Sequence, residues 1–498
     1  MPLNAFECIG DELRLELMTT HHTTPSTLIR NAAAIMTGGR GSADDPARAN
    51  GPDIRIAGDT IEAIGALTPR PGEAIVDATD CVIYPAWVNT HHHLFQSLLK
   101  GDTAGLDATL TPWLAATPYR FRALFDERRF RLAARIGLIE LARSGCATVA
   151  DHNYVYYPDM PFDSSAILFE EAQKLGLRFV LLRGGATRTR QLEAELPSAL
   201  RPETLDAYIA DVERLAARYH DASPRAMQRV VMAPTTVLYS ISPAEMRETA
   251  AVARGLGLRL HSHLSETVGY QDSAHALYRQ SPVAFCGEHD WLGSDVWYAH
   301  LVKVDADEIA LLAQTGTGVA HCPQSNGRLG SGICPVREMA DAGVPVSIGV
   351  DGAASNEAAD MISEVHMTWL AQRARLGMMA QPAFRGGSFE GGASAASVAD
   401  VIHWGTAGGA RIMGLDEVGR IAVGFAADLA VYRLDDPRYF GLHDPAIGPV
   451  ASGGRPSLAA LFSAGKRVVA DDQIDGVDLR ELAREARAAV RELLEEVV

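Results

Sequence analysis

The chain has 498 residues, of which 47% are hydrophobic and 21% are charged. This length can bury a large core and predicts one large domain with a smaller one. With 45 basic and 62 acidic residues, the formal net charge is −17, which disfavours binding to nucleic acid or to anionic membranes. We therefore expect a small-molecule ligand.

No apolar run is long enough to span a bilayer, and the acidic start "MPLNAFECIGDELRLEL" lacks the basic region and apolar core of a secretory signal. We expect a cytoplasmic protein. The six cysteines form no CxxC pair, so the sequence predicts buried free thiols rather than disulfides or a thiolate zinc site.

The two ends of the chain differ from its middle. Residues 27–82 and 415–475 contain short alternating strands and turns, as in "DIRIAGDTIEAIG" and "GRIAVGFAADLAVYRL", and predict one small β-domain built from both ends. Residues 1–26 are expected to form a loose arm and 476–498 a surface helix. The composition of "GGSFEGGASAAS" (386–397) predicts a flexible loop.

Between these flanks, residues 83–414 alternate apolar runs with amphipathic helical stretches. One such helix is predicted at 128–145, where apolar residues recur at helical spacing up to Gly145. No glycine-rich nucleotide motif follows the first strand, and about eight βα units favour a (β/α)8 barrel of the TIM type. The predicted strands are 81–88, 146–151, 177–184, 228–235, 258–264, 295–302, 317–323 and 344–351.

Polar side chains fall at the C-terminal ends of these strands, where parallel barrels build their active sites. Residues i and i+2 of a strand point the same way, so His91 and His93 can both face the interior while His92 faces the helices. Polar capping of a strand would explain one such pair, but not the whole series. The residues at or near strand ends are His91, His93, His263, Glu266, His300, His321 and Asp351.

Three imidazoles and one carboxylate, with a position left for water, suit a hydrolytic divalent metal. The predicted ligands are His91, His93, His263 and Asp351. His261 shares the inward face and could compete with His263, which lies nearer the strand end. Zinc is the expected metal and iron is an alternative. One ion per subunit is expected, because "VVMAPTTV" on the fourth strand offers no bridging lysine or acid.

The motifs "PAWVNTHHHLFQ", "HSHLSE", "YAHLV", "AHCPQSNGRLGSG" and "GVDGAASNE" resemble, in order and spacing, those of the amidohydrolase superfamily, in its branch of mononuclear aminohydrolases and deaminases. This resemblance covers nearly the whole chain. It implies the same metal ligands, with His263 rather than His261, and implies Glu266 as proton shuttle and His300 beside the metal-bound water. It also suggests a homo-oligomer, a dimer or a higher assembly.

The chemistry that the resemblance implies is hydrolytic deamination. The metal lowers the pKa of its water towards 7, and Asp351 and His300 accept the proton and orient the hydroxide. The hydroxide attacks a ring carbon that bears an amino group, and Glu266 protonates the adjacent ring nitrogen. Ammonia then leaves and a carbonyl remains.

The substrate follows from finer likenesses. "NTHHHLFQ" and "SGCATVADH" look most like isoxanthopterin and 8-oxoguanine deaminases and hydroxy-triazine aminohydrolases. Gln96 can donate and accept at once, as an amino-oxo ring edge requires, or it could bond to the backbone in the first loop. Arg183 could pair with a ring carbonyl or enolate, or serve as a structural ion pair. The aromatic residues that could stack on a flat ring, or serve in ordinary packing, are Trp113, Tyr154, Tyr156 and Tyr157.

Two departures bear on that choice. Ala86 stands where the family usually has glycine before the metal motif. Asn153 stands where 8-oxoguanine deaminases are expected to have a histidine, and the tyrosine-rich "NYVYYP" suits a wider ring, which favours isoxanthopterin over 8-oxoguanine. A hydroxy-triazine hydrolase and a non-catalytic scaffold are the other readings. The scaffold is disfavoured because all four ligands and Glu266 are present.

Overall fold

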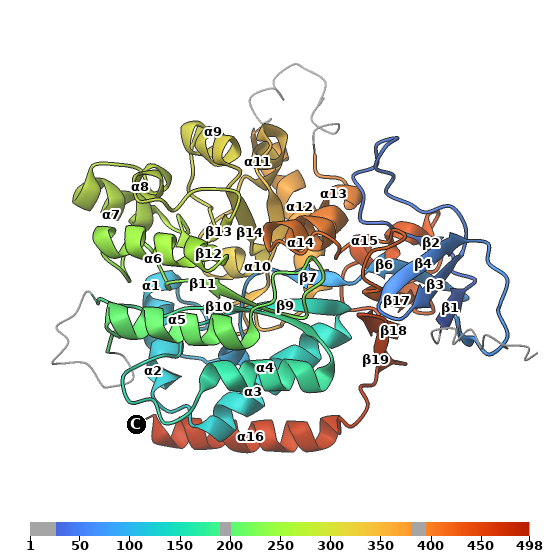
Figure 1. The fold of residues 1–498 in the computed structure, drawn as a ribbon, viewed down its shortest axis with the longest axis horizontal. Helices are drawn as coiled ribbons and strands as arrows, with labels where there is room; N and C mark the ends of the chain where they lie inside the picture. Colours follow the sequence, from blue (N-terminus) through green and yellow to red (C-terminus); the bar gives the residue numbers. More distant parts are fainter. Residues whose placement is uncertain (1–25, 190–200, 380–394, 498) are drawn as a thin grey trace, which may run out of the picture.

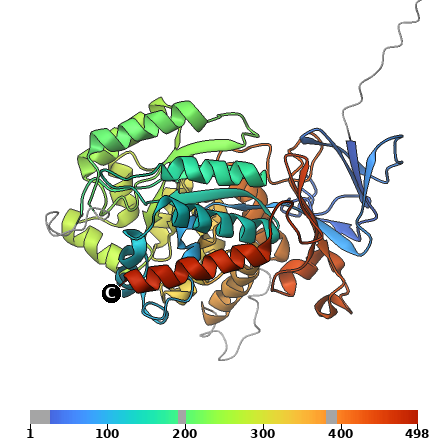
Figure 2. The ribbon, with the colours of Figure 1, turned by 90° about the horizontal axis from the view of Figure 1, so that it is seen from below.

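The computed structural model describes residues 26–189, 201–379 and 395–497. A barrel of parallel strands covered by helices makes up most of the molecule, and two small sheets lie together at one side of it (Figures 1 and 2). In the described part of the chain, no helix is both long enough and apolar enough to cross a membrane.

The barrel has eight strands that pair in chain order, each parallel to the next. Nearly all of their residues are buried, as expected for parallel strands whose two faces are both covered. The predicted (β/α)8 fold is therefore confirmed. The strands are β7 (Trp87–Asn89), β9 (Cys146–Asn153), β10 (Arg178–Arg183), β11 (Gln228–Met232), β12 (Arg259–Leu264), β13 (Val296–His300), β14 (Gly318–His321) and β15 (Val346–Ile348).

The seam between the first and last strands is closed by two short elements. Strand β8 (His92–His93) pairs in parallel with β16 (Asp351–Gly352), and the Thr90 amide donates a hydrogen bond of 3.2 Å to the Ile348 carbonyl. This pairing sets His92 opposite Asp351. Residues 259 positions apart in the chain are thus neighbours at the end of the barrel.

Helices follow the strands and form the outer layer (Figure 1). Their bounds are α1 (Leu110–Ala116), α2 (Pro118–Arg122), α3 (Glu127–Arg143), α4 (Ser164–Leu175), α5 (Leu205–Tyr219), α6 (Pro243–Gly255), α7 (Val268–Tyr278), α8 (Pro282–Glu288), α9 (Ala306–Thr315), α10 (Pro323–Arg328), α11 (Val336–Ala342), α12 (Met361–Met379), α13 (Val398–His403), α14 (Gly409–Ile412) and α15 (Gly448–Ala451).

Helix α3 shows how local sequence sets an element's ends. The Asp126 side chain accepts a hydrogen bond of 2.7 Å from the Arg129 amide and caps the first turn. The chain turns away at Gly145, whose φ is +92°, and a Cβ there would lie 1.9 Å from the Tyr432 hydroxyl. Glycine is required by both the conformation and the space. The predicted helix over 128–145 is confirmed to within two residues at each end.

The predicted first strand, 81–88, is divided in the structure. Residues Cys81–Pro85 form β6, which pairs with β17 (Leu429–Arg433) and β2 (Ala34–Ile35), and only Trp87–Asn89 form barrel strand β7. The apolar run is continuous because both pieces are buried, so periodicity could not reveal the change of sheet at Ala86. The predicted eighth strand, 344–351, is divided in the same way into β15 and β16.

Both ends of the chain contribute to a β-sandwich. One sheet has the order β4 (Thr60–Gly65), β3 (Asp53–Ala57), β1 (Ser26–Arg30), β5 (Ala74–Asp77), and the other β19 (Lys466–Ala470), β18 (Leu458–Ser463), β17 (Leu429–Arg433), β6, β2 (Ala34–Ile35). The apolar core between them includes Ile29, Ile54, Ile83, Leu429 and Phe462. The sandwich predicted from both ends is present, whereas its boundaries at 27–82 and 415–475, and the barrel's at 83–414, stay predictions.

The C-terminal helix α16 (Leu479–Glu496) lies along the outside of the barrel beside α3 (Figures 1 and 2). Arg129 of α3 forms ion pairs with Glu492 and Glu496 of α16. Most of the predicted arm (1–26) lies on residues 1–25, outside the described residues. Most of the loop predicted at 386–397 lies on residues 380–394, which are also outside them.

Candidate functional site

The residues proposed as metal ligands lie at the C-terminal end of the barrel. His91 follows β7, His93 ends β8, His263 is in β12 and Asp351 begins β16. All four side chains are buried. Because neighbouring parallel strands end at the same edge, residues from distant parts of the chain meet there.

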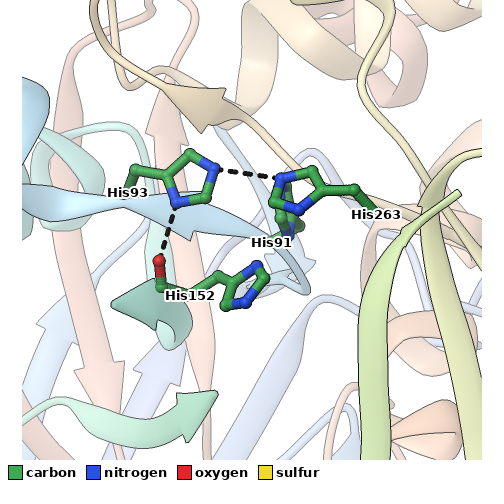
Figure 3. A group of neighbouring side chains, drawn as sticks. All are labelled: His91, His93, His152 and His263. Carbon is green, nitrogen blue, oxygen red and sulfur yellow. Dashed lines mark hydrogen bonds between the residues drawn. The ribbon is translucent and has the colours of Figure 1, made fainter. Parts of the chain in front are cut away.

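The four side chains converge within a few ångströms. Oδ1 of Asp351 lies 3.4 Å from Nε2 of His91 and 3.2 Å from Nε2 of His93. Nε2 of His93 lies 3.3 Å from Nε2 of His263 (Figure 3). The ligand atoms of His91 and His263 also belong to two groups of potential metal ligands, one with His93 and His152 and the other with His300 and Asp351.

Hydrogen bonds at the far side of two of these rings indicate where their protons lie. Nδ1 of His93 is 2.7 Å from the His152 carbonyl, and Nδ1 of His263 is 2.6 Å from the Thr235 carbonyl. A carbonyl only accepts, so each Nδ1 carries the hydrogen and each Nε2 keeps its lone pair. The contact between the two Nε2 atoms in Figure 3 therefore joins two lone pairs.

Charge in the site follows the same pattern. Burial lowers the pKa of His91 and His263 well below its usual value, so both rings are neutral. Nε2 of His91 has no hydrogen-bond partner among the described residues. Neutral imidazole lone pairs beside a carboxylate fit a divalent cation.

The backbone is strained at two of these positions. Asp351 has φ of +60° and His300 has φ of +77°, in the left-handed region that residues other than glycine rarely adopt. Such conformations cost roughly 1–3 kcal/mol and persist where the surroundings enforce them, commonly at functional sites.

Glu266 and His300 lie next to the residues proposed as metal ligands. Nε2 of His300 is 3.7 Å from Oε2 of Glu266 and 4.0 Å from Oδ2 of Asp351. The Ser331 hydroxyl donates a hydrogen bond of 3.2 Å to Oε1 of Glu266. Burial raises the pKa of Glu266. This carboxyl is therefore easier to protonate than an exposed one, as a proton-transfer group requires.

Second contacts hold two of these groups in place. Ser325 donates a hydrogen bond of 2.6 Å to Oδ2 of Asp351, and Nδ1 of His300 donates one of 2.9 Å to the Asn326 amide oxygen. Both residues belong to α10, from "HCPQSNGRLGSG". This motif therefore holds Asp351 and His300 in place through hydrogen bonds from α10.

His152, which the sequence analysis did not assign to the site, is part of it. Its ring lies beside those of His91, His93 and His263 in Figure 3. Its Nε2 donates 2.7 Å to the Ala233 carbonyl, while Nδ1 is buried without a hydrogen-bond partner in the described chain. Its position at the end of the second strand, "CATVADH", was the available signal.

Gln96 and Tyr154 form a buried pair near the ligands. Nε2 of Gln96 donates 2.9 Å to the Tyr154 hydroxyl, and the Tyr154 ring centroid lies 4.9 Å from that of His93. Oε1 of Gln96 has no hydrogen-bond partner among the described residues. A Cβ on Gly352 would lie 1.9 Å from this oxygen, so glycine leaves the room that Gln96 occupies. Trp113 is buried, and its indole donates 3.1 Å to the Ala354 carbonyl.

Arg183 is held by carboxylates of the neighbouring segments. Its guanidinium lies 2.7 Å from Oε1 of Glu203 and 3.0 Å from Oδ2 of Asp211. The guanidinium carbon lies 3.7 Å from the centroid of Tyr156 and 4.7 Å from that of Tyr208. These contacts match the structural ion pair considered from the sequence, and they leave the charge of Arg183 neutralised.

Arg122, at the end of α2, differs from Arg183. It donates 2.5 Å to the Tyr156 carbonyl, its Nε is buried without a partner, and no carboxylate of the described residues pairs with it. Burial lowers the pKa of Arg122. Burial raises the pKa of Tyr154, an effect that the positive charge of Arg122 partly offsets. The sequence offered no signal for this residue, because it lies in the short helix α2, within the long connection after the first barrel strand.

Comparison with known proteins gives a consistent picture. Residues 82–474 match the model of the Amidohydrolase family. The chain is 89% identical over 97% of its length to the whole of an isoxanthopterin deaminase from an unknown prokaryotic organism. It is 35% identical to 8-oxoguanine deaminase of Pseudomonas aeruginosa, over 94% of this chain and 99% of that one.

Solved structures agree with these relatives. An amidohydrolase from an environmental sample of the Sargasso Sea is 79% identical, with a TM-score of 0.83, over 95% of this chain and 100% of that one. Atrazine chlorohydrolase from Arthrobacter aurescens TC1, complexed with zinc, is 26% identical, with a TM-score of 0.82, over 93% of this chain and 100% of that one.

Proposed function

The chain belongs to the amidohydrolase family, and on this premise we propose that it deaminates isoxanthopterin. It is a hydrolase of carbon–nitrogen bonds that releases ammonia from an amino-bearing heterocycle. The observation that carries the substrate is the 89% identity, over 97% of the chain, to an isoxanthopterin deaminase. An 8-oxoguanine or hydroxy-triazine substrate is the alternative.

For the metal, we propose one Zn²⁺ per chain held by His91, His93, His263 and Asp351. The support is the set of buried lone pairs facing one carboxylate, with no hydrogen available between them. His152 and His300 lie close enough to complete other ligand sets, but the chosen four include the only carboxylate among the grouped ligands of the described residues. Bound zinc supplies Lewis-acid activation of water, because it lowers the pKa of water towards 7.

Glu266 and His300 move and place protons in this proposal. Glu266, buried and with a raised pKa, protonates the ring nitrogen beside the carbon under attack, then takes up the proton that the added hydroxyl group loses as the carbonyl forms and passes it to the departing amine. His300 lies between Glu266 and Asp351 and, through its Nδ1 hydrogen bond to Asn326, turns Nε2 towards both carboxylates. It therefore accepts a hydrogen bond from the attacking water and fixes its direction.

Gln96 and Tyr154 recognise the polar edge of the ring. Oε1 of Gln96 has no hydrogen-bond partner among the described residues and can accept a hydrogen bond. Burial raises the pKa of Tyr154 well above its usual value, so its hydroxyl keeps a hydrogen that it can donate. One acceptor beside one donor complements an amino-oxo edge. Trp113 and the ring of Tyr154 provide apolar walls for a flat ring.

For an anionic form of the ring we propose Arg122, and Arg183 as a substrate contact stays a prediction. Arg183 already pairs with Glu203 and Asp211, whereas Arg122 has no carboxylate partner among the described residues. The side chain of Arg122 is half-buried, with its Nε buried and without a hydrogen-bond partner among the described residues, and such a guanidinium favours a negatively charged ligand.

Homo-oligomerisation, a cytoplasmic location and the predicted domain boundaries also stay predictions. Size-exclusion chromatography with light scattering measures the first, and cell fractionation the second.

The test of the function is ammonia release by the zinc-loaded protein. The substrates are isoxanthopterin, pterin, 8-oxoguanine, guanine, cytosine and hydroxy-triazines, and the control is Glu266→Gln at equal metal content. We expect isoxanthopterin to have the highest kcat/KM and the control to have a kcat lower by about 10²–10⁴-fold. Release of an alkylamine from triazines, with none of ammonia from pterins or purines, would instead establish the triazine alternative.

A further inference from the structure

His261 lies between His91, a proposed metal ligand, and the backbone carbonyl of Trp297. It is in β12 and completely buried. Its Nε2 lies 2.9 Å from Nδ1 of His91, and its Nδ1 lies 3.0 Å from the carbonyl oxygen of Trp297 in β13. Both ring nitrogens are therefore engaged, which leaves His261 no free atom for the metal.

The order of these contacts defines the tautomers. The Trp297 carbonyl can only accept, so Nδ1 of His261 carries the hydrogen and Nε2 keeps a lone pair. That lone pair accepts from Nδ1–H of His91. His91 is then left with a lone pair on Nε2, the atom that lies 3.4 Å from Oδ1 of Asp351.

His91 differs in this respect from the other two imidazole ligands. Nδ1 of His93 and of His263 donates directly to a backbone carbonyl. Nδ1 of His91 instead donates to the His261 ring, which in turn donates to the Trp297 carbonyl. The Trp297 indole donates 3.3 Å to the Thr90 carbonyl, next to His91, and its ring lies 4.7 Å from that of His261. Trp297 therefore holds both ends of this chain of hydrogen bonds, through its carbonyl at His261 and through its indole next to His91.

We propose that His261 is a positioning residue that sets the tautomer and ring orientation of His91 for metal binding. Partners of this kind orient ligating histidines and typically contribute 10- to 100-fold to metal affinity. The proposal rests on the metal site put forward above. It does not depend on which heterocycle is the substrate.

Two amide substitutions separate the two bonds that His261 makes. In His261→Gln, the amide oxygen can reach the place of Nε2 and accept from His91. In His261→Asn, the shorter amide can replace Nδ1 towards Trp297 but cannot reach His91. His289→Gln is the matched control, because His289 is also buried and bonded to a carbonyl, that of Phe285, but lies after α8 and outside the site.

The measurement is the dissociation constant of Zn²⁺ and of Co²⁺ by chelator competition, with the visible spectrum of the Co²⁺ form. We expect His261→Asn to bind about 10- to 100-fold more weakly with a changed Co²⁺ spectrum, and His261→Gln and His289→Gln to resemble the parent. Parent-like affinity in His261→Asn would overturn the proposal, as would equal weakening in the Asn and Gln variants. A parent that binds no metal would overturn the metal site as well, whereas metal binding without deaminase activity would overturn only the proposed function.

Discussion

The β-sandwich and the C-terminal end of the barrel both bury polar side chains, but they satisfy them differently. In the sandwich, Arg55 makes hydrogen bonds of 2.6 and 3.1 Å to Glu73, and Asp53 accepts from the amides of Asn31 and Leu67. In the barrel, Nε2 of His91 and Oε1 of Gln96 have no hydrogen-bond partner among the described residues.

This difference indicates what each region does. A buried polar group without a partner costs about 1–3 kcal/mol, and left-handed backbone at Asp351 and His300 adds to the cost. The barrel end accepts these costs because its groups are aimed at ligands. The sandwich is a structural region, in which the buried carboxylates of Asp53 and Glu73 are paired within the chain, although Nε of Arg30 and Oγ of Ser463 have no hydrogen-bond partner among the described residues. Substitutions should therefore affect function in one region and stability in the other.

Asp351→Asn gives the largest expected effect. It removes the carboxylate shared by His91 and His93, and we expect loss of bound metal and of all measurable turnover. The metal-free variant should melt at or above the temperature of the metal-free parent, because a buried negative charge has been removed. Metal analysis and calorimetry measure both effects. A lower melting temperature of the metal-free variant would contradict the contrast between the regions.

Glu266→Gln should lower kcat by about 10²–10⁴-fold, since it removes a proton-transfer group. The metal content should stay at the parental level, because Glu266 is not among the grouped ligands of the described residues. Steady-state ammonia release with metal analysis tests this. Loss of metal together with activity would show that Glu266 acts as a ligand.

Arg122→Gln should lower kcat/KM for an anionic substrate by about 10- to 100-fold, because a hydrogen bond to a charged group contributes roughly 1.5–3 kcal/mol. The melting temperature should change little. Arg183→Gln is the comparison: it removes the ion-pair partner of Glu203, while Asp211 keeps Arg214, and should lower stability by about 3–5 kcal/mol. If Arg183→Gln weakened kcat/KM at unchanged stability, the assignment of the two arginines would have to be exchanged.

Glu73→Gln, in the sandwich, should leave kcat/KM unchanged and lower the free energy of unfolding by about 1–3 kcal/mol at pH 7. The Arg55 hydrogen bonds lower the pKa of Glu73 to about 2 from 4.5. The stabilisation is therefore present above pH 4.5 and is lost as the pH falls towards 2. Urea unfolding of parent and variant at pH 7 and pH 3.5 should show the difference shrinking. A constant difference would show that the charge of Glu73 is not involved.

Much of the barrel and its site could be predicted because the relevant signals are local. Apolar runs separated by amphipathic helices indicated eight parallel strands, and each strand of the barrel sheet falls within or overlaps its predicted range. The spacing of His91 and His93 indicated that both face inward, and the structure places both against Asp351. The division of residues 81–88 between two sheets could not be predicted, because both pieces are equally apolar.

The sequence by itself determined which residue types stand at the ends of the strands, because side-chain alternation and helix periodicity depend only on near neighbours. Tertiary structure decided which of them meet. The contact of His91 with His261 spans 170 positions, and the neutralisation of Arg183 depends on segments that follow it by 20 and 28. Such partners are set by strand register and by the packing of distant loops, which no local pattern encodes.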